Sequence, residues 1–131
     1  MSIGTNDLTQ YIFAADRGNA ALASMQDALH PAVLRAIALI TAAGRDADVP
    51  VAVCGEAAGD PASACVLVGL GVSELSADAG SLDALRATLA RFTRSELEDL
   101  ASRAIKAADS VSVRALATEF LALGRADAGH G

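Results

Sequence analysis

The stretch Val49-Pro50-Val51-Ala52-Val53-Cys54, followed by Gly55-Glu56-Ala57-Ala58-Gly59-Asp60-Pro61, decides how this chain folds. The first six residues form a short continuous apolar run, which is typical of a parallel strand buried on both faces. The next seven are rich in turn-forming residues, and they end with Asp60 as a helix N-cap and Pro61 at the first helical position. The stretch therefore predicts a strand, a loop and the start of a helix.

Two further short strands flank this stretch. Residues 2–4 read as the end of a strand that has lost its beginning, and residues 72–76 read as a third strand. Strands that alternate with helices imply parallel pairing with right-handed crossovers. Because a three-stranded parallel sheet covers its edges poorly, we expect an α/β fold that is the C-terminal portion, about three βα units, of a (β/α)8 TIM barrel.

Helices are predicted for most of the remaining chain. Asn6 is expected to cap a short helix near the start, and Gly44 to end a longer one that begins at Pro31. Later helices are predicted over residues 62–70 and 78–91, up to about residue 108, and over residues 111–123. Residues 1–123 are therefore the expected partial barrel domain, and residues 124–131 a flexible tail.

The composition excludes several classes of function. Of the 131 residues 53% are hydrophobic but only 3% aromatic, so the core must consist of Ala, Val, Leu and Ile. A net charge of -6 without a basic patch argues against a nucleic-acid partner. No apolar stretch is long enough to span a membrane, and no segment resembles a signal peptide. The two cysteines, Cys54 and Cys65, indicate reduced thiols in a cytoplasmic protein.

The run Gly4-Thr5-Asn6-Asp7 combines a strand end with two polar side chains. Active sites of β/α barrels lie at the C-terminal ends of the strands, and the free N–H groups at a helix start can hold an anion. Asp7 supplies a hard oxygen ligand suited to Mg²⁺. Taken alone, the same pair is more often an ordinary helix cap.

Other residues can also take part in such chemistry. Arg17, in a glycine-containing loop, can bind phosphate through two hydrogen bonds, or it can be a solvated charge. Cys54, directly after a strand, can donate or accept a proton, or it can be a buried structural thiol. Cys65 is expected only to pack, and His30, before Pro31, to cap a helix or pack on the surface.

Four runs in this order resemble one family closely. They are residues 2–11, 15–19, 30–34 and 53–61, and residues 69–76 fit it as well. Together they resemble the C-terminal phosphoenolpyruvate-binding barrel domain of Enzyme I of the bacterial sugar phosphotransferase system. Pyruvate phosphate dikinase and phosphoenolpyruvate synthase share the barrel and a similar Asn-Asp strand end, so they remain the alternative.

The resemblance implies both a reaction and the residues that perform it. Enzyme I transfers the phosphoryl group of phosphoenolpyruvate to its own histidine and on to a phosphocarrier protein, and it releases pyruvate. By resemblance, Asn6 and Asp7 contact phosphoenolpyruvate, Asp7 also ligates Mg²⁺, and Arg17 holds the substrate phosphate. Cys54 would protonate the enolpyruvate carbon. These roles suit a reaction in which cations offset the charge of the transferring group.

The resemblance also implies that much of the enzyme is absent. Enzyme I is several times longer, and its phospho-accepting histidine and earlier barrel strands have no counterpart in these 131 residues. We therefore expect a piece of a working enzyme that is inactive alone. One alternative is a module whose open apolar sheet faces and strand edges are covered by another copy, as a homo-oligomer. The other is a non-catalytic binding protein that keeps part of the barrel.

Overall fold

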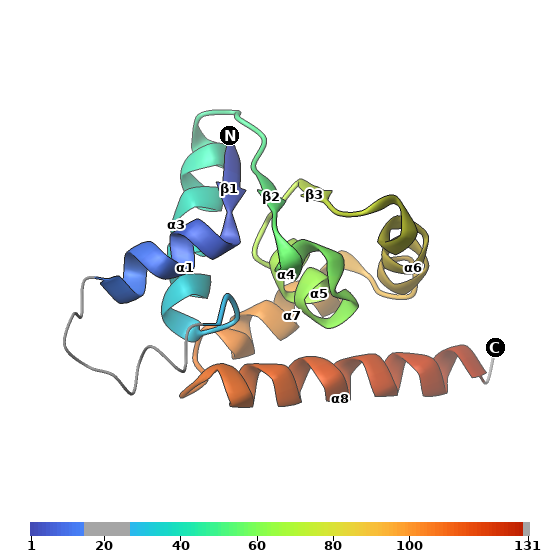
Figure 1. Ribbon diagram of the computed structural model, residues 1–131. Coiled ribbons are helices and arrows are strands. Elements are labelled where there is room, and N and C mark those ends of the chain that lie inside the picture. Colours follow the sequence, from blue (N-terminus) through green and yellow to red (C-terminus); the bar gives the residue numbers. More distant parts are fainter. Residues whose placement is uncertain (15–26, 130–131) are drawn as a thin grey trace.

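The computed structural model describes residues 1–14 and 27–129 of the chain. Short strands alternate with helices, and a long helix at the C-terminal end lies across the other elements (Figure 1). The elements in chain order are β1 (Ser2–Gly4), α1 (Thr5–Ala14), α3 (Pro31–Asp46), β2 (Ala52–Cys54), α4 (Glu56–Gly59), α5 (Pro61–Gly69), β3 (Glu74–Ser76), α6 (Ala79–Leu89), α7 (Arg94–Ala104) and α8 (Ser110–Gly129). This arrangement confirms the predicted α/β class.

The strands form one parallel sheet in the order β1-β2-β3. Neighbours in the sheet are thus neighbours in the chain, as expected when each connection is a helical crossover. The register pairs Gly4 with Cys54, and Cys54 with Ser76. The three strands therefore end at the same level, and the segments that follow them start from one edge of the sheet.

The two faces of the sheet differ in character. Ile3 and Val53 are buried, and Leu75 packs against the same apolar core. The alternating positions lie on the opposite face, carry small or polar side chains, and are all exposed or half-buried: Ser2, Gly4, Ala52, Cys54, Glu74 and Ser76. The expectation of an open apolar sheet face is therefore wrong, because the uncovered face is not apolar.

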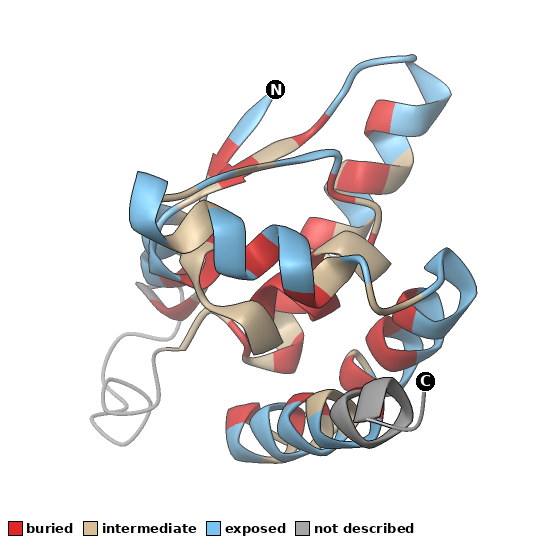
Figure 2. Ribbon diagram, turned by 90° about the vertical axis from the view of Figure 1, so that its right-hand side faces the viewer, coloured by how far each residue is buried: buried red, intermediate tan, exposed pale blue. Residues whose placement is uncertain are grey.

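The core lies between the sheet and the helices, with α5 at its centre (Figure 2). Every residue from Ser63 to Leu67 is buried, and among them Cys65 has the packing role predicted for it. Helix α7 approaches α5 closely at Gly69, where an added Cβ would collide with the backbone oxygen of Leu97. Such a close approach requires glycine at this position.

Several predicted helix boundaries are wrong for identifiable reasons. Helix α1 begins at Thr5, so Asn6 lies in its first turn and is not its N-cap. Helix α3 continues past Gly44 to Asp46. Gly44 instead makes room for the returning chain, because an added Cβ would lie 2.7 Å from Cγ2 of Val51. The loop predicted after Cys54 contains the short helix α4.

The last helix extends further than predicted. Helix α8 reaches Gly129, so residues 124–129 are helical where a tail was expected from residue 124. Gly124 is buried against the ring of Phe92, which also stacks on Phe120 with 4.2 Å between ring centroids. Among the described residues, no helix has both the length and the apolar character needed to cross a membrane.

Candidate functional site

Thr5 joins the ends of β1 and β2. Its side chain is fully buried, and its Oγ1 donates a hydrogen bond of 3.1 Å to the carbonyl oxygen of Cys54. Thr9 adds a second bond one turn later, since its Oγ1 donates to the Thr5 carbonyl oxygen at 2.6 Å. Nothing in the local sequence indicates this role for Thr5, because its partner lies 49 residues away. The bond to Cys54 fixes the start of α1 against the end of β2, and the bond from Thr9 lies within α1.

Asn6 and Asp7 follow directly, in the exposed first turn of α1. The carboxylate of Asp7 lies close to the strand end. Its Oδ2 is only 3.4 Å from the position that a Cβ would take on Gly4. An acidic side chain in the first turn also interacts favourably with the helix dipole. Both residues therefore stand at the edge where Cys54 ends the neighbouring strand, as predicted.

Gly55 allows the chain to leave β2 at that edge. Its φ of 113° lies in the region that side-chain-bearing residues rarely adopt. An added Cβ would also lie only 2.6 Å from Oγ1 of Thr5. Glycine is thus required at this position twice over, by its backbone conformation and by the space that Thr5 occupies. It holds Glu56 and α4 close to the start of α1.

The two cysteines differ in accessibility and hydrogen bonding. Cys54 is half-buried, and its Sγ donates a weak hydrogen bond of 3.5 Å to the carbonyl oxygen of Ile3. Cys65 is fully buried in α5, and burial raises the pKa of its thiol to about 11. A thiol reacts as the thiolate and only where a reagent can reach it, so the two side chains should behave differently.

Alkylation should therefore distinguish the two thiols. With iodoacetamide at pH 8 we expect Cys54 to be modified in the folded chain and Cys65 to remain unmodified. Both should react in urea, because unfolding removes the burial. Mass spectrometry after digestion with Glu-C, which cleaves at Glu56 between the two cysteines, measures the two sites separately. Equal labelling of both residues in the folded chain would contradict the burial described for α5.

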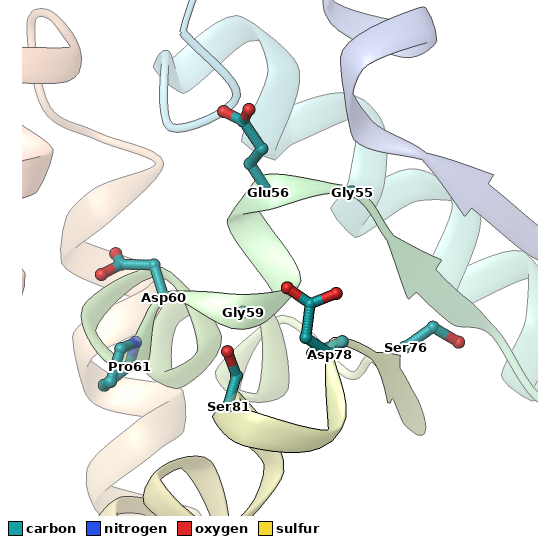
Figure 3. A pocket seen from close by; sticks show the side chains of 9 residues that line it. Gly55, Glu56, Gly59, Asp60, Pro61, Ser76, Asp78 and Ser81 are labelled. Atoms are coloured by element: carbon teal, nitrogen blue, oxygen red, sulfur yellow. The ribbon is translucent and has the colours of Figure 1, made fainter.

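Two pockets open beside the strand ends. The first has a volume of about 720 Å³ and is lined by the loops after β2 and β3. Figure 3 shows its acidic side chains apart from one another, on separate elements: Glu56, Asp60 and Asp78. Asp60 is already engaged as the N-cap of α5, since its Oδ2 accepts bonds from the backbone N and Oγ of Ser63. This confirms its predicted capping role.

The second pocket, which we call the Asn6 pocket, has a volume of about 340 Å³. Its polar lining comes from five separate parts of the chain: Asn6, Asp27, Glu56, Asp60, Ser63 and Arg114. Asp27 and Arg114 had no predicted role, since nothing in the sequence indicates a contact between residues 87 positions apart. Neither Asp7 nor Cys54 lines these two pockets, although both stand at the same edge of the sheet.

His30 takes a structural position. It is the N-cap of α3, where its Nδ1 accepts a hydrogen bond of 3.1 Å from the backbone N of Ala32. Its ring also meets the ring of Phe13 edge-on, with 5.0 Å between centroids. These contacts confirm that His30 caps and packs. Arg17, the predicted phosphate-binding residue, lies outside the described residues.

A magnesium ion could use only part of its ligand set from this region. Among the described residues, no group of three or more His, Cys, Asp or Glu side chains could hold a metal ion. Mg²⁺, however, commonly takes one or two carboxylates and completes its shell with water and substrate phosphate oxygens. The exposed carboxylate of Asp7 fits such a partial role.

Comparisons with known proteins match most of this chain. The family described as "PEP-utilising enzyme, PEP-binding domain" matches residues 1–94. A phosphoenolpyruvate-protein phosphotransferase of Streptomyces coelicolor is 52% identical over 110 residues, which are 84% of this chain and 20% of that protein. A multiphosphoryl transfer protein of Xanthomonas campestris is 49% identical over 115 residues, 88% of this chain and 14% of that protein.

A third relative, from another organism, gives a similar match. A phosphoenolpyruvate-protein phosphotransferase of Haloferax volcanii is 43% identical over 117 residues, which are 89% of this chain and 21% of that protein. The chain thus spans about a fifth of the length of its phosphotransferase relatives. The family match covers β1 to the first residue of α7, and so it includes all three strand ends described above. The chain belongs to the family of PEP-utilising enzymes.

Proposed function

We propose that this chain forms one side of the phosphoenolpyruvate site of a phosphoenolpyruvate-protein phosphotransferase of the Enzyme I type. The observation that carries this proposal is the pairing of Gly4 with Cys54, which brings Asn6 and Asp7 to the same edge as the thiol. The phosphotransferase names of the relatives favour Enzyme I over the dikinase and synthase alternatives.

We further propose that the three βα units belong to a (β/α)8 barrel. The strands are parallel and lie in chain order, as successive barrel strands do. The face away from the apolar core carries small residues such as Gly4, Ala52 and Ser76, which suit the crowded interior of a closed barrel. In such a barrel the Asn6, Asp7 and Cys54 edge is the C-terminal one, where substrates bind.

In this proposal the residues at the edge divide the work. Asn6 and Asp7 hold phosphoenolpyruvate, and Arg17 binds its phosphate through two hydrogen bonds. Asp7 also ligates Mg²⁺, which when bound would offset the negative charge on the transferring group. The bond from phosphorus to the enol oxygen breaks, and the phosphoryl group passes to a histidine nitrogen elsewhere in the enzyme. A phosphocarrier protein takes it from there.

Cys54 completes the reaction by giving up a proton. Loss of the phosphoryl group leaves the enolate of pyruvate, whose terminal carbon must gain a proton to form the methyl group. The Cys54 thiol supplies that proton and becomes a thiolate, which then recovers a proton from water. The contact of its Sγ with the Ile3 carbonyl oxygen, at 3.5 Å, holds the side chain at the strand end.

The proposal has consequences for location and assembly. We place the enzyme in the cytoplasm, where the two cysteines, both free, would stay reduced. We expect the 131-residue chain to be inactive alone, because the accepting histidine and further substrate ligands lie in other parts of the enzyme. Self-association as a homo-oligomer stays a prediction; it would now depend on the strand edges, since the uncovered sheet face is small and polar.

Replacing Asp7 by Asn tests the metal role. This substitution keeps the shape of the side chain and removes its charge. In the full-length enzyme the Mg²⁺ concentration needed for half-maximal pyruvate formation should rise by about 100-fold or more. Removing a group that only orients a metal ligand already lowers metal affinity by about 10–100-fold. The measurement is the rate of pyruvate formation over a range of Mg²⁺ concentrations.

Asp78→Asn is the matched control, because Asp78 is also an exposed carboxylate at the start of a helix that follows a strand. It should leave the Mg²⁺ dependence unchanged. If Asp7→Asn and Asp78→Asn behaved alike in an otherwise active enzyme, the proposed metal role of Asp7 would be wrong. An inactive wild-type enzyme would instead overturn the proposed function as a whole.

A further inference from the structure

Asp27 and Arg114 form a two-point ion pair that joins α8 to the chain before α3. Arg114 donates from Nε to Oδ2 of Asp27 and from a terminal guanidinium nitrogen to Oδ1, each at 2.8 Å. The Asp27 side chain is only 22% exposed, whereas that of Arg114 is 52% exposed. Bidentate pairs of this kind are stronger and more directional than a single exposed ion pair.

The carboxylate of Asp27 is also tied to its own backbone. Its Oδ1 accepts a hydrogen bond of 2.9 Å from the backbone N of Leu29, a residue that is fully buried. The hydrogen bonds outweigh the effect of burial and hold the pKa of Asp27 below its usual value, so the carboxylate is ionised at neutral pH. Arg114 therefore fixes the position of the main chain at residues 27–29 as well as one side chain.

A second contact links the same regions. Nε of Arg35, in α3, donates a hydrogen bond of 3.0 Å to the carbonyl oxygen of Ile105, just after α7. The N-terminal end of α8 lies beneath the start of α3 (Figure 1). The C-terminal helices thus support the chain that leads into α3 at two points, and only the Arg114 contact reaches a pocket at the strand ends.

We propose that Arg114 is a positioning residue for phosphoenolpyruvate, which acts through Asp27 on the Asn6 pocket. Asp27 and Ala28 form part of the wall of this pocket, and Asn6 forms another part. Fixing that wall keeps the surface around Asn6 in one arrangement before substrate arrives, which lowers the cost of binding. Arg114 lies beyond the family match to residues 1–94, so α8 would contribute to the site from outside the matched domain. This inference rests on the function proposed above.

The test is a set of substitutions in the full-length enzyme that carries this domain. Arg114→Gln and Asp27→Asn should each raise the KM for phosphoenolpyruvate about tenfold, with kcat changed less than about threefold. The double variant Asp27→Asn with Arg114→Gln should raise KM no further than either single variant, because both substitutions remove the same pair. Arg103→Gln is the matched control: its side chain is also 52% exposed and paired, with Asp99 at 3.2 Å, but it lines neither pocket.

The outcomes separate this proposal from the one on which it rests. If Arg114→Gln lowered the melting temperature but left KM equal to that of Arg103→Gln, the pair would be structural only and the positioning role would be wrong. A double variant whose KM rose by the product of the two single effects would also overturn it, since the two residues would then act independently. If the wild-type enzyme formed no pyruvate from phosphoenolpyruvate, the proposed function would fail first, and this inference with it.

Discussion

Replacing Cys54 by Ala in the full-length enzyme is expected to slow pyruvate formation by about 10²- to 10⁴-fold, the range that a positioned proton donor supplies. The enolate would then have to take its proton from water, which is not held at the reacting carbon. Stability should change little, because Cys54 is half-buried and its Sγ makes only a weak bond to Ile3. Steady-state pyruvate formation and a thermal melt measure the two effects separately.

Cys65→Ala provides the control within the same chain. Cys65 is fully buried, so its truncation should cost about 1 kcal/mol of stability through lost packing while leaving the rate unchanged. The two variants should therefore show opposite patterns. Cys54→Ala should lose activity and keep its stability, and Cys65→Ala should keep its activity and lose stability. A Cys54→Ala enzyme that forms pyruvate at the wild-type rate would remove Cys54 from the mechanism.

Replacing Gly55 by Ala should give the largest loss of stability of any substitution at the strand ends. The new residue would have to adopt a φ near 113°, and its Cβ would lie 2.6 Å from Oγ1 of Thr5. Backbone strain and overpacking together should cost about 2–5 kcal/mol. Because Thr5 would be pushed away from the Cys54 carbonyl, pyruvate formation should fall as well. Urea denaturation measures the first effect.

Gly80→Ala is the matched control for that substitution. Gly80 lies in α6, and no atom stands within 4 Å of the position that a Cβ would take. Alanine is the better helix former, so this variant should be more stable than the wild type by about 0.5–1 kcal/mol. If Gly55→Ala unfolded at the wild-type urea concentration, the close packing of β1 and β2 at Thr5 would not exist as described.

Local signals in the sequence predicted local structure well. The N-caps at Asp60 and His30 were correctly expected, because each depends on a side chain and backbone N–H groups within three residues. Asn6 was wrongly expected to be a cap. The actual helix start depends on Thr5, whose hydrogen bond reaches a carbonyl on another strand. The expectation that Gly44 ends a helix was wrong for the same reason. The atoms that lie against Gly44 belong to Val49 and Val51, in the segment that follows α3.

The candidate site was predictable to a similar depth. Asn6 and Asp7 follow one strand and Cys54 ends the next, so parallel pairing was enough to expect them at one edge of the sheet. The resemblance to PEP-utilising enzymes, which the family match confirms, supplied their expected chemistry. The link from Arg114 to Asp27 could not be expected, because it depends on how α8 crosses the start of α3.

The small and polar face of the sheet also determines how this chain can meet another protein surface. It carries five side chains, those of Ser2, Ala52, Cys54, Glu74 and Ser76, while Gly4 has none, so the face offers little hydrocarbon to remove from water. A partner that covered this face, whether the rest of the enzyme or a second copy, would gain mainly polar side-chain contacts there. The heat-capacity change of that association would be small for the area covered, because heat capacity follows the burial of apolar surface. Calorimetry would therefore report assembly at this face as a chiefly enthalpic event.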